Sequence, residues 1–150
     1  MNVLVVEPGA KPYQQEIGED LPALCKAIDA DLIEVIYPFE DEVALICDEE
    51  GKLNAKPLNR SLKTEEGEVY DIIAGKFILT GLGEEDFASL PDDLMKKYTE
   101  RFRYGERFVL HNSRIIVCPV PDGDHEDHVL ETGSRSRQQE RDPFRREDAR

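Results

Sequence analysis

The sequence predicts a compact α+β domain with a mostly antiparallel sheet built from hairpins, two helices and a disordered C-terminal tail. Three observations lead to this fold class. Short runs of β-branched and aromatic residues alternate with turns rich in glycine, proline and acidic residues. Two segments repeat apolar residues with the spacing of a helix. Few connections are long enough for the crossovers that parallel strands require, so sequential strands are expected to pair antiparallel.

The N-terminal segment predicts a hairpin followed by a helix. Residues 3–6, with the sequence VLVV, predict a short apolar strand, and the turn residues of EPGAKP separate it from a second strand at YQQEI. Asp20 is placed to cap the helix that follows, and Pro22 is tolerated in its first turn. The apolar residues of this helix recur with helical spacing at Leu21, Leu24, Cys25 and Ile28.

The middle of the chain predicts three further strands. LIEVIYPF and EVALIC, separated by Pro38 and an acidic turn, predict two adjacent strands, and Gly51 suits the turn after them. PLNRSL, residues 57–62, predicts one turn of helix or a loop. Residues 70–81, YDIIAGKFILTG, form the longest apolar run and predict a central strand in which Gly75 marks a bulge or a close backbone approach.

The last part of the folded body predicts a helix and a hairpin. Ser89 and Asp92 form an S-x-x-D capping pattern. The helix face that follows is marked by Leu90, Leu94, Tyr98 and Phe102. RFVLH and IIVCPV, around Asn112 and Ser113, predict a closing hairpin. We therefore expect an acidic domain over residues 1–120 and an acidic linker with a disordered, mixed-charge tail over residues 121–150.

The chain is strongly acidic, with a net charge of −14, of which residues 1–130 carry −15 and the last twenty residues +1. Nonspecific nucleic-acid binding depends on lysine and arginine replacing condensed counterions, so this charge argues against direct nucleic-acid binding. A host protein with a basic surface is a better partner, for which this chain would be an acidic decoy. A solvated surface explains the acidic clusters as well. These clusters lie in expected turns and helix starts, at residues 40–42, 48–50, 65–68, 84–86 and 92–93.

The cysteines and the N-terminus predict the compartment. Cys25, Cys47 and Cys118 each lie inside an apolar string without the spacing of a zinc site, so we expect buried thiols in a reducing environment. The N-terminus has no basic leader, and its apolar run is too short for a signal core or a membrane span. The prediction is a cytoplasmic protein that does not interact with membranes.

Strong catalytic motifs are absent from the sequence, and no cofactor is indicated. PDGDHEDH, residues 121–128, offers oxygen and imidazole groups that could bind a metal, although an acidic linker explains the same residues. These weak candidate ligands, which would form an adventitious site, are Asp122, Asp124, His125, Asp127 and His128.

One central segment gathers amides and a lone arginine in an acidic body. Asn54, Asn59 and Arg60, together with Gly75, are candidate ligand-binding residues, because amides and one guanidinium can orient a small ligand. They could equally serve structure, with the asparagines bonding their own backbone and Arg60 pairing with Glu49, Glu50 or Asp71.

Several strings in combination resemble a known family. ICDEEGKLNAKPLNRSL, GEVYDIIAGKFILTG and EDFASL, with the N-terminal VLVVEPGAKPY and IEVIYPFEDEVALIC, resemble the domain-of-unknown-function family 3846 over roughly residues 1–102. The resemblance implies an accessory protein of phages or conjugative elements and implies no particular reaction. The chain departs from the family pattern at DADLIE and in its arginine-rich tail.

The sequence favours a binding module of the host cytoplasm, which binds a host protein or a small ligand. One alternative is an enzyme acting on a small phosphorylated or acidic metabolite, with Arg60 orienting the substrate and Asp71 or Glu68 as the general base. A second alternative is a purely structural or regulatory module. A homodimer is a further alternative, in which the strand FVLH would extend a sheet between two copies.

Overall fold

The computed structural model describes residues 1–121 of the chain. This part contains two helices and antiparallel strands, as the sequence predicts. Contacts divide the chain into two units, and each is described by itself: residues 1–103, here called the N-terminal unit, and a second unit that begins at Tyr104. The predicted body of residues 1–120 contains the N-terminal unit and the hairpin that follows it. No helix within residues 1–121 is long and apolar enough to cross a membrane.

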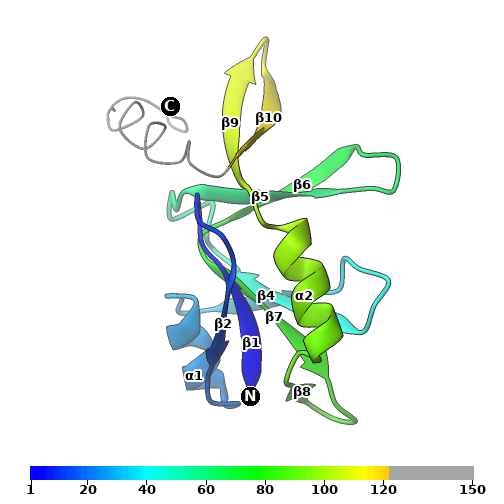
Figure 1. The fold of residues 1–150 in the computed structure, drawn as a ribbon. Coiled ribbons are helices and arrows are strands. Elements are labelled where there is room, and N and C mark those ends of the chain that lie inside the picture. The colour runs from blue at the N-terminus through cyan, green and yellow to red at the C-terminus, as the bar shows by residue number, and fades with distance from the viewer. Residues whose placement is uncertain (122–150) are drawn as a thin grey trace. The chain divides into compact units, whose positions relative to one another are not determined.

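Six strands form the main sheet of the N-terminal unit, and every pairing is antiparallel (Figure 1). The strand order is β2-β1-β7-β4-β3, and the short β8 pairs with β7. Leu79 of β7 lies opposite both Leu4 of β1 and Leu45 of β4, so the most apolar strands are the central ones. The strands are β1 (Asn2–Val6), β2 (Tyr13–Glu16), β3 (Ile33–Ile36), β4 (Val43–Asp48), β7 (Phe77–Leu82) and β8 (Phe87–Ala88).

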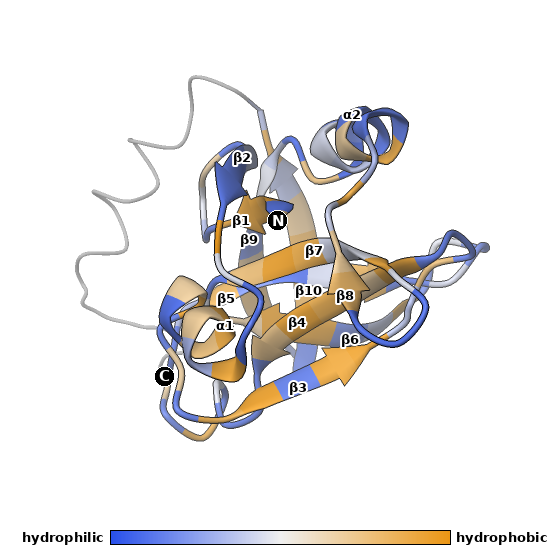
Figure 2. Cartoon of the chain, turned by 90° about the horizontal axis from the view of Figure 1, so that it is seen from below, coloured by the Kyte–Doolittle hydropathy of each residue, from blue (hydrophilic) through white to orange (hydrophobic). Residues whose placement is uncertain are grey.

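Both faces of this sheet are buried, which explains why its central strands are continuously apolar rather than alternating. Figure 2 colours β7 and β4 mostly as hydrophobic. One face packs on α1 (Leu21–Ala27), and the other packs on α2 (Asp92–Arg101) and on strands β5 and β6. The first cluster contains Val3, Val5, Leu24, Ile28, Ile46 and Ile78. The second includes Leu4, Leu45, Leu62, Ile73, Phe77, Leu79, Tyr98 and Phe102.

Local sequence signals account for the start of α1 but not for that of α2. The Asp20 carboxylate accepts a hydrogen bond from the N–H of Ala23 at 3.0 Å, which confirms the predicted cap. The predicted capping by Ser89 is wrong, because α2 begins at Asp92 with Pro91 at the N-cap position and has no side-chain cap. The Ser89 hydroxyl instead accepts from the N–H of Asn2 at 2.8 Å and so joins the chain before α2 to β1.

Two other predictions are corrected by a second, two-stranded sheet. Residues 57–62 do not form a helical turn or a loop, because Leu58–Lys63 is strand β5. The apolar run 70–81 is not one strand: β6 (Val69–Ala74) pairs with β5, and β7 belongs to the main sheet. The chain turns between them at Gly75, whose φ of +85° favours glycine.

The second unit contains the predicted closing hairpin, formed by β9 (Gly105–His111) and β10 (Arg114–Val120). Its turn residues, Asn112 and Ser113, have φ values of +51° and +65°. Two successive positive φ values match the twist of a tight two-residue hairpin turn. The predicted tail and the candidate metal ligands of residues 122–128 lie outside the described residues.

Candidate functional site

Asn59 and Arg60 lie together in the interior of the N-terminal unit, and neither side chain is exposed. The register of β5 against β6 shifts between Leu58 and Arg60, which leaves Asn59 without an opposite residue. Such a bulge changes the direction of a side chain. The Asn59 Oδ1 atom accepts from Arg60 Nη1 at 2.8 Å, so these two consecutive side chains contact each other.

The Arg60 guanidinium donates to carbonyl groups from two distant segments. Nη2 donates to the carbonyl of Phe102 at 2.8 Å and to that of Ala10 at 2.6 Å, and Nη1 donates to the carbonyl of Glu7 at 3.3 Å. Phe102 is the C-cap of α2, where carbonyl groups lack helical partners. Arg60 therefore connects the β1–β2 turn to the end of α2.

The Asn59 amide connects the end of β1 to the turn at Gly75 through its Nδ2 atom. It donates to the carbonyl of Val6 at 2.9 Å and to that of Gly75 at 2.8 Å. Three of the candidate ligand-binding residues, Asn59, Arg60 and Gly75, are thus brought into one network. Asn54 lies apart from it, exposed in the turn between β4 and β5, where its N–H donates to the carbonyl of Glu50. Their role toward a ligand stays a prediction.

A depression of about 320 Å³ opens to solvent beside Gly75, between four loops. A Cβ atom at Gly75 would approach Lys56 Cδ to 2.8 Å, so glycine allows the lysine stem to lie against the backbone. Little in the sequence indicates this arrangement, since most of the charged lining residues are marked only by an adjacent glycine or proline. The depression is lined by Glu7, Pro8, Ile28, Asp29, Lys56, Pro57, Gly75 and Lys76.

The charged groups around the depression pair with one another. Lys56 Nζ lies 2.6 Å from Asp48 Oδ2 and donates to the carbonyl of Asp29, and Lys76 Nζ lies 3.4 Å from Asp29 Oδ2. Burial alone would raise the pKa of Asp48, but hydrogen bonds from Lys56 and from the N–H of Glu50 outweigh it and lower the pKa. Lys56 and Lys76 therefore pair with carboxylates of the same unit.

The residues considered for catalysis do not form an acid–base pair around Arg60. Asp71 pairs with Lys52 at 2.9 Å and accepts from the N–H of Ile72, and Glu68 is exposed in the β5–β6 turn. Burial, followed by the charge of Glu34, raises the pKa of the Cys47 thiol to about 12, so this thiol is protonated at neutral pH. Cys118 is exposed, which corrects the expectation that every cysteine is buried.

The described residues contain no group of three or more side chains suited to hold a metal ion. The candidate metal ligands lie in the part of the chain that the structure does not describe, so that prediction stays a prediction.

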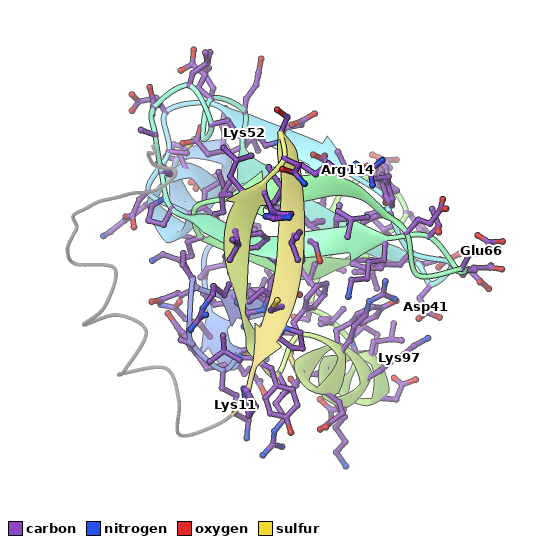
Figure 3. The ribbon with its side chains drawn as sticks, turned by 90° about the horizontal axis from the view of Figure 1, so that it is seen from above. Lys11, Asp41, Lys52, Glu66, Lys97 and Arg114 are labelled. Carbon is purple, nitrogen blue, oxygen red and sulfur yellow. The ribbon has the colours of Figure 1, made fainter. Side chains whose placement is uncertain are left out.

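Exposed carboxylates gather on one side of the N-terminal unit, where Figures 1 and 3 show the β3–β4 loop and the β5–β6 turn on the same side of the sheet. Figure 3 labels Asp41 and Glu66 there. We call this surface the acidic face. It consists of the exposed residues Glu40, Glu42, Glu65, Glu66 and Glu68.

The β3–β4 loop of the acidic face is held in place by α2. Asp41 Oδ2 accepts from Lys97 Nζ at 2.6 Å and from the Tyr98 hydroxyl at 2.8 Å, and these hydrogen bonds lower the pKa of Asp41. Burial, together with Asp41, raises the pKa of Tyr98. The Phe39 ring packs 4.6 Å from that of Tyr98. Asp41 is therefore used inside the fold, while Glu40 and Glu42 on either side of it remain exposed.

Comparisons with known proteins identify a family. A family model described as a domain of unknown function (DUF3846) matches residues 1–103, which is more than half of the chain. No curated protein and no solved structure matches. The matched region ends where the N-terminal unit ends, so the hairpin lies outside it. The chain belongs to the DUF3846 family.

Proposed function

We propose that this member of the DUF3846 family is an accessory binding protein of a phage or another mobile element. It acts in the host cytoplasm and binds a host protein that has a basic surface. The acidic face makes this contact, and the protein acts as a decoy that occupies the basic surface of its partner.

The observation that carries the proposal is the unequal use of charges in the N-terminal unit. Residues 1–103 contain 23 acidic and 11 basic side chains. Arg60 is buried, and five other basic side chains have carboxylate partners within the same unit, mostly at its surface: Lys52, Lys56, Lys76, Lys97 and Arg103. Each of these five pairs takes up one acidic and one basic side chain, so 18 acidic and six basic side chains lie outside the pairs, and one of those six, Arg60, is buried. Among the groups outside the pairs, acidic side chains therefore outnumber basic ones by three to one, against about two to one in the composition.

The geometry of the acidic face also supports the proposal. Its loop is held by hydrogen bonds to α2, and its turn is closed by the Glu68 N–H, which donates to the Thr64 hydroxyl at 3.2 Å. Binding by pre-ordered groups loses less conformational entropy than binding by mobile ones. Charges that are arranged in this way also accelerate encounter with an oppositely charged partner.

The test measures binding to a lysine-rich helical peptide of defined sequence. The variant replaces all five residues of the acidic face with glutamine, and we expect its affinity to fall at least tenfold. The wild-type affinity should also fall steeply as salt is added, because screened charges carry the interaction.

A matched control separates the acidic face from net charge. It replaces five exposed glutamates elsewhere with glutamine, namely Glu16, Glu19, Glu34, Glu84 and Glu85. The control has the same net charge as the first variant and should lose much less affinity. Equal losses would show that binding follows net charge, and affinity retained at high salt would contradict the electrostatic mechanism.

A further inference from the structure

The hairpin of β9 and β10 exposes large apolar side chains on both of its faces. The exposed fractions are 41% for Val109, 66% for Leu110, 51% for Ile115 and 43% for Ile116. Val109 lies opposite Ile116, and Leu110 lies opposite Ile115. Opposite residues share a face and neighbours alternate, so each face carries one of these pairs.

Two strands are too few to be stable in water by themselves, since an isolated hairpin is marginal and a third strand or a packing partner is needed. Within residues 1–121, β9 and β10 pair only with each other. The hairpin therefore requires a packing partner for stability, and its strands have edges to which another strand can be added.

The two edges of the hairpin differ. β10 contains Pro119, which has no N–H to donate, and proline in a sheet is typical of an outer edge. β9 contains no proline over its seven residues, so it can accept another strand along its length. Extension of the sheet is expected at β9.

Charge favours the hairpin over the N-terminal unit as the region where two copies of this chain meet. The N-terminal unit carries −12, so the N-terminal units of two copies repel each other. Residues 104–121 carry +1, from Arg107 and Arg114 against Glu106. The hairpin is thus the region where two copies meet with the least like-charge repulsion.

We propose that the hairpin is a self-association element, which pairs through β9 with the hairpin of a second copy of this chain. Two hairpins joined in this way form a four-stranded antiparallel sheet, which exceeds the minimum for a stable sheet. A two-fold axis at Phe108 or Val109 keeps Arg107 from facing its own copy, a pairing that would be unfavourable. This contact is separate from the acidic face and does not depend on it.

Sedimentation equilibrium of the full chain over a range of concentrations tests the proposal. We expect a reversible dimer whose dissociation constant decreases as salt is added, because salt screens the repulsion between the N-terminal units. The acidic face predicts the opposite salt response for its own partner, so the two proposals can fail independently.

A double variant locates the contact. Leu110→Thr with Ile115→Thr removes apolar area but keeps residues that favour strands, so the hairpin is retained. We expect the dissociation constant to rise at least tenfold. The control places threonine at two exposed apolar residues of the N-terminal unit, Leu53→Thr with Tyr37→Thr, and should leave the dissociation constant unchanged.

Three results would overturn the proposal. A chain that stays monomeric at every concentration would show that the hairpin is covered by its own chain or by another protein. A dimer that is equally sensitive to both double variants would place the contact elsewhere. A dimer that dissociates as salt rises would show that attraction between charges, and not the apolar hairpin, holds the copies together.

Discussion

Residues 1–103 bury both faces of a six-stranded sheet, whereas the hairpin of residues 105–120 exposes apolar side chains on both faces. The net charge of residues 1–103 is −12, and that of the hairpin is +1. One chain therefore contains a region whose apolar side chains are buried in its own core and a second region whose apolar side chains remain exposed. The first is suited to bind through charge and the second through apolar contact.

The largest expected effect concerns the interior of the N-terminal unit. Arg60→Met keeps an unbranched apolar stem but removes the guanidinium, whose N–H groups donate to the carbonyls of Glu7, Ala10 and Phe102. A buried acceptor left without a partner costs about 1–3 kcal/mol and a partly buried one costs less, so we expect the free energy of unfolding to fall by about 2–4 kcal/mol in all. Urea denaturation measures this loss.

The control for that prediction is Arg101→Met, because Arg101 is exposed on α2. An exposed substitution of this kind should change the free energy of unfolding by less than about 1 kcal/mol. If both variants were equally stable, Arg60 would not be the connection between the β1–β2 turn and α2 that its geometry indicates.

A smaller effect is expected at Asp48, whose side chain is almost fully buried against Lys56. The pKa of Asp48 in the folded protein is lowered below its ordinary 3.8, so the carboxylate contributes stability above pH 3.8, and this contribution is lost as pH falls through the folded pKa. Asp48→Asn should cost about 1–3 kcal/mol at neutral pH.

Denaturation at a series of pH values checks this prediction. The difference in the free energy of unfolding between the wild type and Asp48→Asn should decrease in acid, because protonation removes the charge of the Asp48 carboxylate. A difference that is independent of pH would mean that the ion pair with Lys56 contributes nothing. The same series sharpens the comparison of the two regions, because the hairpin contains one acidic residue, Glu106.

The smallest effect is expected in the hairpin turn. Ser113 has a φ of +65°, a region that glycine adopts without a steric cost. Ser113→Gly should stabilise the hairpin by about 0.5–1 kcal/mol, since Asn-Gly is preferred in this turn type. Hydrogen exchange of the hairpin amides measures the gain, which appears as slower exchange than in the wild type. Ser113→Ala is the control, and its amides should not exchange more slowly than those of the wild type in either strand. Unchanged protection in the glycine variant would mean that the turn does not limit the stability of the hairpin.

Local patterns predicted most elements of the fold. The apolar string at residues 3–6, the Asp20 cap and the Asn112–Ser113 turn were recognised because each depends on neighbours in the sequence. β5 was missed because its residues lack an alternating pattern, and Asn59 and Arg60 are buried by partners more than forty positions away. The candidate site was predicted only as a group of residue types.

Most helices and strands, the family and the excess of acidic side chains could be recognised from the sequence alone. The tertiary structure decided that Gly75 separates two strands of different sheets and that Arg60 is an interior group. Folding also determines which carboxylates form ion pairs within the protein and which remain exposed on the acidic face. The physical reason is that hydrogen bonding and burial depend on groups that meet only after the chain has folded, whereas turns, caps and periodicity depend on residues that are already adjacent.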